Sequence, residues 1–167
     1  QYDTSDEATK IGEGAFSRVY RGTYRFAGTV PKPVALKEMK AVVGSSDLDW
    51  IAELQIGVQI SHENLVNVFG HFTHGNTKCL VMELLAETLK DAICDPNRQL
   101  PWKLRLKWCS EVSTGMQFLH AQFPPILHQD LKSNNVLLTE PKAGAGPVAK
   151  IGDFGRSKAL LSTVVHT

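Results

Sequence analysis

Short runs of β-prone residues, separated by turns, dominate the first half of the chain. Residues 11–24 (IGEGAFSRVYRGTY) place two glycines before a run that holds Val19 and Tyr24, which predicts a strand, a turn and a second strand. After a loop with two prolines, VALKEM predicts a third strand, and the runs NLVNVFGHF and KCLVMELL, joined by the turn HGNT, predict two more. The first half is therefore expected to consist mostly of strands.

One helix is predicted to interrupt these strands. The segment from Ser45, SSDLDWIAELQIGVQI, opens with an N-capping pattern in which Ser46 is followed three residues later by Asp49. A helix with one apolar face is then indicated by the spacing of Leu48, Ile51, Ala52 and Ile56.

The pattern changes past about Leu85. TLKDAI predicts a short helix, and Pro101 begins a longer one whose apolar residues recur every three or four positions, at Leu104, Trp108, Val112, Met116 and Leu119. A loop rich in Gly, Ala and Pro then leads to the strand VAKIG. The predicted fold class is α+β, with a β-rich part containing one helix (residues 1–85) and a partial, mainly helical part (residues 86–167).

Composition argues against several classes of protein. The 167 residues are 43% hydrophobic and 21% charged, as in globular proteins. A net charge of +1 without a long basic run argues against a nucleic-acid surface, and no apolar run approaches the roughly 20 residues of a membrane-spanning helix. Three cysteines without a CxxC pair argue against a disulfide framework, so we expect a reducing, cytoplasmic location.

The first candidate site is the glycine pair Gly12 and Gly14. Glycine allows the backbone to approach a phosphate closely because no Cβ intervenes. Taken alone, the pattern is explained more simply by an ordinary glycine hairpin, since Ser17 replaces the third glycine of G-x-G-x-x-G. A strand follows rather than a helix, which argues against a dinucleotide-binding turn.

A second candidate is an ion pair between a strand and the first helix. Strand alternation puts Ala35, Lys37 and Met39 on one face, where a lysine is costly to bury unless an anion meets it. Glu53 on the helix would satisfy that charge and leave ammonium protons for a phosphate. A surface lysine and a solvent-facing glutamate are the alternatives.

The remaining candidates lie in ILHQDLKSNNVLL and IGDFG. Asp130 can accept a proton from a hydroxyl, Asn135 can supply a neutral oxygen to a metal, and Lys132 can reach a transferred phosphate. His128 is predicted to be structural. Asp153 follows a strand and suits Mg²⁺, although a turn aspartate that caps its own backbone is the alternative.

In this order, the glycine hairpin, strand lysine, helix glutamate, D-x-K-x-x-N loop and DFG turn resemble the eukaryotic protein kinase family over essentially the whole chain. DLKSNN is similar to a serine/threonine-type catalytic loop. LHAQFPPILHQDLKSNNVLL and KIGDFGRSK are similar to the tyrosine-kinase-like group, which includes receptor-interacting and mixed-lineage kinases. The resemblance implies a two-lobed fold that binds ATP in the cleft between the lobes.

The resemblance also implies a role for each matching position. Nucleotide contacts fall on Gly12, Gly14, Val19, Ala35, Lys37, Met82, Glu83, Leu85, Asn135 and Asp153. Within this set, Lys37 holds the α- and β-phosphates and is oriented by Glu53, and Met82 is the gatekeeper. Asn135 and Asp153 hold Mg²⁺. Asp130 accepts or orients the substrate hydroxyl, with Lys132 beside it.

Three departures from the family pattern stand out. Gln129 replaces the arginine that pairs with a phosphorylated activation loop, so we expect no switching by that ion pair. Gly57 replaces an apolar side chain, so we expect a gap near Phe154 and a higher melting temperature for Gly57→Leu. The chain ends soon after DFGRSK without an APE signature, so we expect it to be part of a longer chain and inefficient by itself.

An Mg²⁺- and ATP-dependent serine/threonine protein kinase is the main interpretation, with a protein substrate and signalling adaptors as partners. A pseudokinase or nucleotide-binding scaffold is the alternative, suggested by Gln129 and by the chain length. The retained Lys37, Asp130, Asn135 and Asp153 favour phosphate transfer. A small-molecule kinase of similar fold is a third interpretation.

Overall fold

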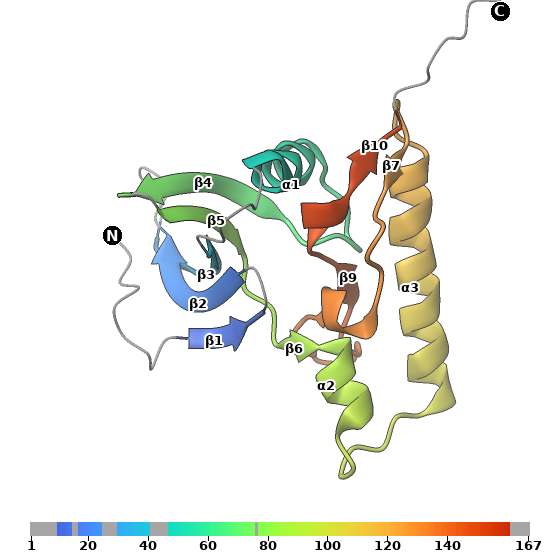
Figure 1. Cartoon of the computed structure of the whole chain (residues 1–167). Coiled ribbons are helices and arrows are strands. Elements are labelled where there is room, and N and C mark those ends of the chain that lie inside the picture. Colours follow the sequence, from blue (N-terminus) through green and yellow to red (C-terminus); the bar gives the residue numbers. More distant parts are fainter. Residues whose placement is uncertain (1–9, 15–16, 25–29, 41–46, 76, 161–167) are drawn as a thin grey trace, which may run out of the picture. The chain divides into compact units, whose positions relative to one another are not determined.

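The computed structural model describes residues 10–14, 17–24, 30–40, 47–75 and 77–160 (Figure 1). The chain divides into two compact units. The first unit comprises Gln1–Ile60 with Asn67–Leu84, and the second comprises Ser61–Val66 with Leu85–Thr167. Residues 61–66 thus pack with the second unit although they lie within the β-rich part of the sequence.

A five-stranded antiparallel sheet forms the first unit, with the strand order β1-β2-β3-β5-β4. Its strands are β1 (Lys10–Glu13), β2 (Ser17–Tyr24), β3 (Lys32–Met39), β4 (Val68–His74) and β5 (Thr77–Glu83). Their order confirms the predicted run of strands. Buried apolar side chains from three neighbouring strands pack into a core, formed by Tyr20, Val34, Leu36 and Val81.

The structure describes one helix in this unit, α1 (Asp47–Gln59), which packs against β4. Its buried positions include Trp50, Glu53 and Ile56, whereas Ile51 is 40% exposed. The helix was predicted, but the expected apolar face was wrong at Ile51. The buried stripe includes a glutamate, because Lys37 neutralises its charge, so counting apolar residues alone misplaces the stripe.

The expected gap at Gly57 is also wrong. A Cβ atom built at Gly57 would lie 2.5 Å from Cγ2 and 3.1 Å from Cβ of Val68. Carbon atoms in ordinary van der Waals contact stay about 3.5–4.0 Å apart. Glycine at this position therefore allows α1 to approach β4 closely, and the predicted gain in stability from Gly57→Leu is withdrawn.

We expect Gly57→Ala to lower the melting temperature. Overpacking against Val68 costs about 1–3 kcal/mol, which exceeds the gain of about 1 kcal/mol in helix propensity. Thermal unfolding followed by circular dichroism measures the difference. Val58→Ala, on the exposed side of the same helix, serves as the control, and Val68→Ala combined with Gly57→Ala should recover part of the loss. A melting temperature equal to or above that of the wild type contradicts the close approach.

The second unit contains two helices and two small sheets among its described residues. The helices are α2 (Leu89–Cys94) and α3 (Trp102–His120). One sheet has the order β6-β8-β9, from Glu87–Thr88, Val136–Leu138 and Ala149–Ile151, and the other pairs β10 (Lys158–Ala159) with β7 (Ile126–Leu127). Short 3₁₀ turns cover Ser133–Asn135 and Phe154–Arg156.

Helix α3 forms one side of the core of this unit. Trp108 and Leu119 are buried, as the predicted apolar stripe requires. Trp108 packs in a cluster with residues from α2, β8 and β9, namely Ala92, Val136, Leu138 and Ala149. The two predicted helices of this half are therefore confirmed. Among the helices that the structure describes, none combines the length and hydrophobicity needed to cross a bilayer.

Segment 61–66 departs from the predicted strand NLVNVFGHF. Strand β4 begins only at Val68, and Leu65 instead forms a parallel bridge with Ile151 of β9. Leu65 and Val66 are 1% and 4% exposed. Burial in the second unit, rather than pairing within the first sheet, thus determines the conformation of this segment.

Candidate active site

The site residues predicted from the sequence are divided between the two units. In the first unit, β1 and β2 form the glycine hairpin, with Gly12 opposite Val19 and Glu13 opposite Arg18. The N–H of Gly14 donates to the carbonyl of Ser17 at 2.9 Å, which closes the turn. Residues 15–16 at its tip lie outside the described residues.

A cluster of charges holds this hairpin. Lys40 Nζ lies 2.6 Å from Glu13 Oε1 and donates to the Gly14 carbonyl at 2.8 Å. Lys10 and Arg18 lie 3.3 and 3.4 Å from the same carboxylate. Hydrogen bonds from Lys40 and Lys10 lower the pKa of Glu13 from 4.5 to about 2. The ion pairs therefore persist at neutral pH and are lost only as the pH falls from about 4.5 toward 2.

The predicted ion pair between β3 and α1 is confirmed. Lys37 Nζ donates to Glu53 Oε1 at 2.6 Å, and the two side chains are only 10% and 2% exposed. Lys37 lies opposite Val19 on β2 and Leu80 on β5, so its backbone belongs to the central strand of the sheet. A buried pair of this kind holds the lysine in one orientation.

The end of β5 carries the predicted adenine contacts. Met82 lies opposite Ala35 of β3. The N–H of Glu83 donates to the Asn67 carbonyl at 3.0 Å, and its carboxylate Oε1 accepts from the Asn67 backbone N–H at 2.7 Å. The Asn67 contacts thus fix the backbone of β5 at its last residue. Leu85, in the second unit, is half-buried.

In the second unit, Asp130 is the centre of a polar cluster. Its Oδ2 accepts from Lys132 Nζ at 2.7 Å and from Asn135 Nδ2 at 3.0 Å. The same Nδ2 donates to the Asp130 carbonyl at 2.8 Å. The hydrogen bond from Lys132, with smaller contributions from Asn135 and Arg156, holds the pKa of Asp130 below its ordinary value of 3.8. Asp130 is therefore a carboxylate at neutral pH.

Asn135 and Asp153 are neighbours in space. The N–H of Gly152 donates to the Asn135 carbonyl at 2.8 Å, which brings the residue before Asp153 against the turn Ser133–Asn135. Asp153 itself is exposed and adopts a left-handed backbone conformation, with φ 65°. This conformation is sparsely populated for residues other than glycine, so the surrounding contacts must hold it.

His128 provides several of those contacts. Its Nδ1 accepts from the Asp130 N–H at 3.3 Å, and its Nε2 lies 3.0 Å from the Gly152 carbonyl. Because a backbone N–H only donates and a carbonyl only accepts, these partners require the neutral tautomer that carries its proton on Nε2. The ring packs edge-on against Phe154, with centroids 5.6 Å apart. The predicted structural role of His128 is confirmed.

Comparison with known proteins identifies the family. The family model described as "Protein tyrosine and serine/threonine kinase" matches residues 6–166. The chain belongs to the protein kinase family. It is 35% identical over 157 residues to calmodulin-binding receptor-like cytoplasmic kinase 2 of Arabidopsis thaliana, covering 92% of this chain and 37% of that protein. It is 32% identical to serine/threonine-protein kinase PBS1 of the same plant, covering 95% of this chain and 36% of that protein.

This kinase domain spans about a third of the length of the curated relatives that it matches. Two of these three relatives are named receptor-like kinases, and none of the three is named a receptor-interacting or mixed-lineage kinase. The predicted α+β kinase fold, with a sheet-rich first part and a helical second part, is confirmed.

The kinase domain therefore brings its predicted residues together in two groups. One holds Lys37 and Glu53 in the first unit, and the other holds Asp130, Lys132, Asn135 and Asp153 in the second.

Sequence reasoning missed Ser157, which is 3% exposed and donates from Oγ to the His128 carbonyl at 3.3 Å. It also missed the contact of Lys40 with Gly14, since nothing in the sequence marks a lysine three residues after Lys37 as a partner of the hairpin.

Proposed function

We propose that this kinase domain transfers the γ-phosphoryl group of ATP to serine or threonine hydroxyls of a protein substrate. The observation that carries the proposal is the polar cluster around Asp130, in which Lys132 and Asn135 hold one carboxylate oxygen, next to Asp153. Phosphoryl transfer depends mainly on positioning and on neutralising charge, and this cluster supplies both. The names of relatives such as PBS1 support the serine/threonine class.

The first unit supplies groups suited to the nucleotide. We assign the phosphate contact to Lys37, whose ammonium group Glu53 orients through a hydrogen bond of 2.6 Å. The hairpin with Gly12, Gly14 and Val19 would cover the nucleotide, as its glycines allow close backbone approach.

The adenine ring would pack on Ala35, with Met82 opposite it on β5 as the gatekeeper. Glu83 and Leu85 would bind the adenine edge through their backbones. Because the N–H of Glu83 donates to Asn67, its adenine contact falls on its carbonyl oxygen.

The residues of the second unit fit Mg²⁺. A carboxylate and a neutral amide oxygen are hard donors of the kind this ion prefers. Both side-chain hydrogen bonds described for Asn135 are donated by Nδ2 to Asp130. The amide oxygen Oδ1 therefore points away from Asp130, and we assign it as the metal ligand. We propose that Asn135 and Asp153 hold the ion. When bound, Mg²⁺ would neutralise the charge that develops on the phosphate oxygens.

Asp130 would accept a hydrogen bond from the substrate hydroxyl and orient its oxygen. Its lowered pKa makes it a weak base but keeps it ionised, so orientation is its main contribution before the proton is transferred. Lys132, 2.7 Å from Asp130, would contact the transferred phosphate and Asp130 together. The choice of serine and threonine over tyrosine rests mainly on Lys132.

Transfer of radiolabelled phosphate from ATP to a generic protein substrate, followed by phosphoamino-acid analysis, tests this function in the full-length protein. We expect Mg²⁺-dependent labelling of serine and threonine, and its loss in Asp153→Asn. Wild-type labelling no greater than that of Asp153→Asn would instead favour a pseudokinase or nucleotide-binding scaffold. Labelling that survives chelation of the metal would contradict the Mg²⁺ dependence.

We further propose a cytoplasmic location, a protein substrate and signalling adaptors as partners. The location is supported by the name of calmodulin-binding receptor-like cytoplasmic kinase 2. The finer placement in the group of receptor-interacting and mixed-lineage kinases stays a prediction, based on LHAQFPPILHQDLKSNNVLL and KIGDFGRSK.

Regulation by the usual arginine–phosphate ion pair is not expected. Gln129 is exposed, carries no charge and has a left-handed backbone with φ 62°. Segment 158–160 is instead fastened by pairing of β10 with β7 and by the Leu160 N–H, which donates to the Pro125 carbonyl at 2.8 Å. We expect phosphatase treatment to change the activity of wild type and Gln129→Ala by the same factor. A phosphorylation response lost only in Gln129→Ala would contradict this.

Lys40→Met is expected to raise the KM for ATP about threefold with little change in kcat. The variant removes the contact with the Gly14 carbonyl and the shortest of the three ion pairs of Glu13. It also removes one positive charge beside the hairpin that we assign to the phosphates, and a solvent-screened charge of this kind contributes little. Lys10→Met, which lacks a described bond to Gly14, is the control. An unchanged KM would show that the cluster does not act on the nucleotide.

A further inference from the structure

Strand β9 is paired along both of its edges. On one edge it pairs with β8. On the other, segment 61–66 acts as a partial strand, since the Val66 N–H donates to the Ile151 carbonyl and the Ile151 N–H donates to the Asn64 carbonyl, both at 2.8 Å. Asn64 Nδ2 also donates to the Ala149 carbonyl at 3.1 Å. None of these bonds involves the N–H of Ala149, at the start of the strand.

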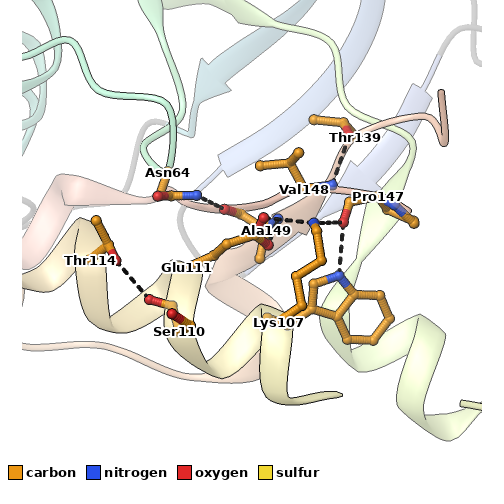
Figure 2. Close-up of polar contacts among 10 residues, drawn as sticks. Asn64, Lys107, Ser110, Glu111, Thr114, Thr139, Pro147, Val148 and Ala149 are labelled. Atoms are coloured by element: carbon orange, nitrogen blue, oxygen red, sulfur yellow. Dashed lines mark hydrogen bonds and ion pairs between the residues drawn. The ribbon is translucent and has the colours of Figure 1, made fainter. Parts of the chain in front are cut away.

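A helix side chain provides the acceptor for that N–H. Glu111 Oε2, on α3, accepts from the Ala149 N–H at 2.9 Å, as Figure 2 shows. Ala149 has an exposed fraction of 0%, so water cannot replace this acceptor. A buried N–H that loses its partner costs about 1–3 kcal/mol. Glu111 therefore supplies the acceptor for Ala149, which precedes the part of β9 that pairs with segment 61–66.

Lys107 fixes the orientation of this carboxylate. Its Nζ lies 2.6 Å from Glu111 Oε1 and donates to the Pro147 carbonyl at 2.7 Å (Figure 2). Trp108 Nε1 donates to the same carbonyl at 3.1 Å. Each oxygen of Glu111 thus has its own partner, and the backbone from Pro147 to Ala149 is fastened to one turn of α3.

The fastened strand leads directly to the proposed metal ligand. Asp153 follows Ala149 by four residues, about 13 Å along an extended chain. Between these two residues, Gly152 makes two hydrogen bonds. Its N–H donates to the Asn135 carbonyl, and its carbonyl oxygen lies 3.0 Å from His128 Nε2. The backbone of Asp153 is therefore held near Asn135 and His128 by the strand that Glu111 secures at its other end.

We propose that Glu111, oriented by Lys107, is a positioning residue for Asp153 and so for the binding of Mg²⁺. The proposal rests on the proposed function, because it assigns the metal to Asn135 and Asp153. Removal of the acceptor at Ala149 lets the start of β9 separate from α3, and the ligand four residues later loses its fixed position. Glu111 itself touches neither metal nor nucleotide.

Three variants separate this role from a general contribution to stability. Glu111→Ala removes the acceptor. In Glu111→Gln, one amide oxygen must serve both partners, so an N–H₂ group faces either Lys107 or the Ala149 N–H. Lys107→Met combined with Glu111→Gln removes that conflict and restores the acceptor for Ala149. Thr114→Ala is the control on the same helix, since Thr114 bonds only to Ser110 within α3 among the described contacts (Figure 2).

Two measurements on the full-length protein do not depend on phosphate transfer. Hydrogen exchange followed by mass spectrometry reports the amides of residues 148–153. Titration of Mg²⁺ against the melting temperature, in the presence of ATP, gives an apparent Mg²⁺ constant. The exchange and kcat are measured at a temperature where every variant is folded.

We expect Glu111→Ala to raise the apparent Mg²⁺ constant about tenfold and to speed exchange across residues 148–153. The double variant should return both quantities to within about twofold of the wild type, and Thr114→Ala should change neither. A Glu111→Ala protein with an unchanged Mg²⁺ constant, whatever its melting temperature, overturns the proposal. If the wild type binds Mg²⁺ and ATP but transfers no phosphate, the proposed function fails. The apparent Mg²⁺ constant and the exchange of residues 148–153 then still decide whether Glu111 positions Asp153.

Discussion

Asp130→Asn is expected to lower kcat for phosphate transfer by about 10²–10⁴-fold while leaving the melting temperature nearly unchanged. The asparagine keeps an oxygen that can accept from Lys132 and Asn135, so the cluster can retain its geometry. It loses the negative charge that orients the substrate hydroxyl and receives its proton. Initial rates at saturating ATP and Mg²⁺, together with thermal unfolding, measure the two effects separately.

Asn134→Ala provides the matched control for this change. Asn134 lies in the same loop and is exposed, so its loss should leave kcat within about twofold and stability within about 0.5 kcal/mol. Retention of a third or more of the wild-type rate by Asp130→Asn would contradict the assigned role. It would do so even if Asp153→Asn were inactive, because that result would place the chemistry on another group.

The pH dependence of the wild type follows from the same contacts. Lys132 lowers the pKa of Asp130 below its ordinary 3.8, so the folded state favours the ionised form. The resulting stabilisation is complete above the unfolded pKa and is lost as the pH falls through the lower folded value. Protonation of Asp130 therefore should not limit activity between pH 6 and 8.

Much of this architecture could be predicted from the sequence because it depends on local patterns. The glycine hairpin follows from residues within 14 positions, and the stripe of α3 follows from spacing within one helix. Asp130, Lys132 and Asn135 lie within six residues, so a loop that turns at Ser133–Asn135 brings them together with no help from distant segments. The short separation of these residues along the chain was therefore enough to predict that they lie together.

The features that sequence reasoning missed depend on partners far along the chain. Ile51 was assigned to the buried face of α1 because the count of apolar residues ignored Glu53, whose burial requires Lys37, 16 residues earlier. Gly57 was interpreted as a gap because the sequence does not show that Val68, on strand β4, fills the space beside it. Glu111 resembles any surface glutamate of a helix until β9, 38 residues later, is seen to need an acceptor.

Removing one partner of the Lys37–Glu53 pair is expected to have the largest effect on stability. Breaking a buried ion pair from one side costs about 3–5 kcal/mol, because the other charge stays in a site that excludes water. With side chains 10% and 2% exposed and atoms 2.6 Å apart, this pair meets that condition. We therefore expect both Lys37→Met and Glu53→Leu to lower the free energy of unfolding in urea by about that amount.

The double variant Lys37→Met with Glu53→Leu separates the two roles of the pair. Apolar replacement of both partners is often neutral or stabilising, so the double variant should regain most of the stability that either single variant loses. It should regain no phosphate transfer, because the ammonium group proposed to hold the phosphates is gone. A double variant as unstable as the single variants would contradict the explanation that each single variant is destabilised by the unpaired charge left behind. A double variant that recovers activity would remove Lys37 from the nucleotide site, since stability alone would then explain the loss in each single variant.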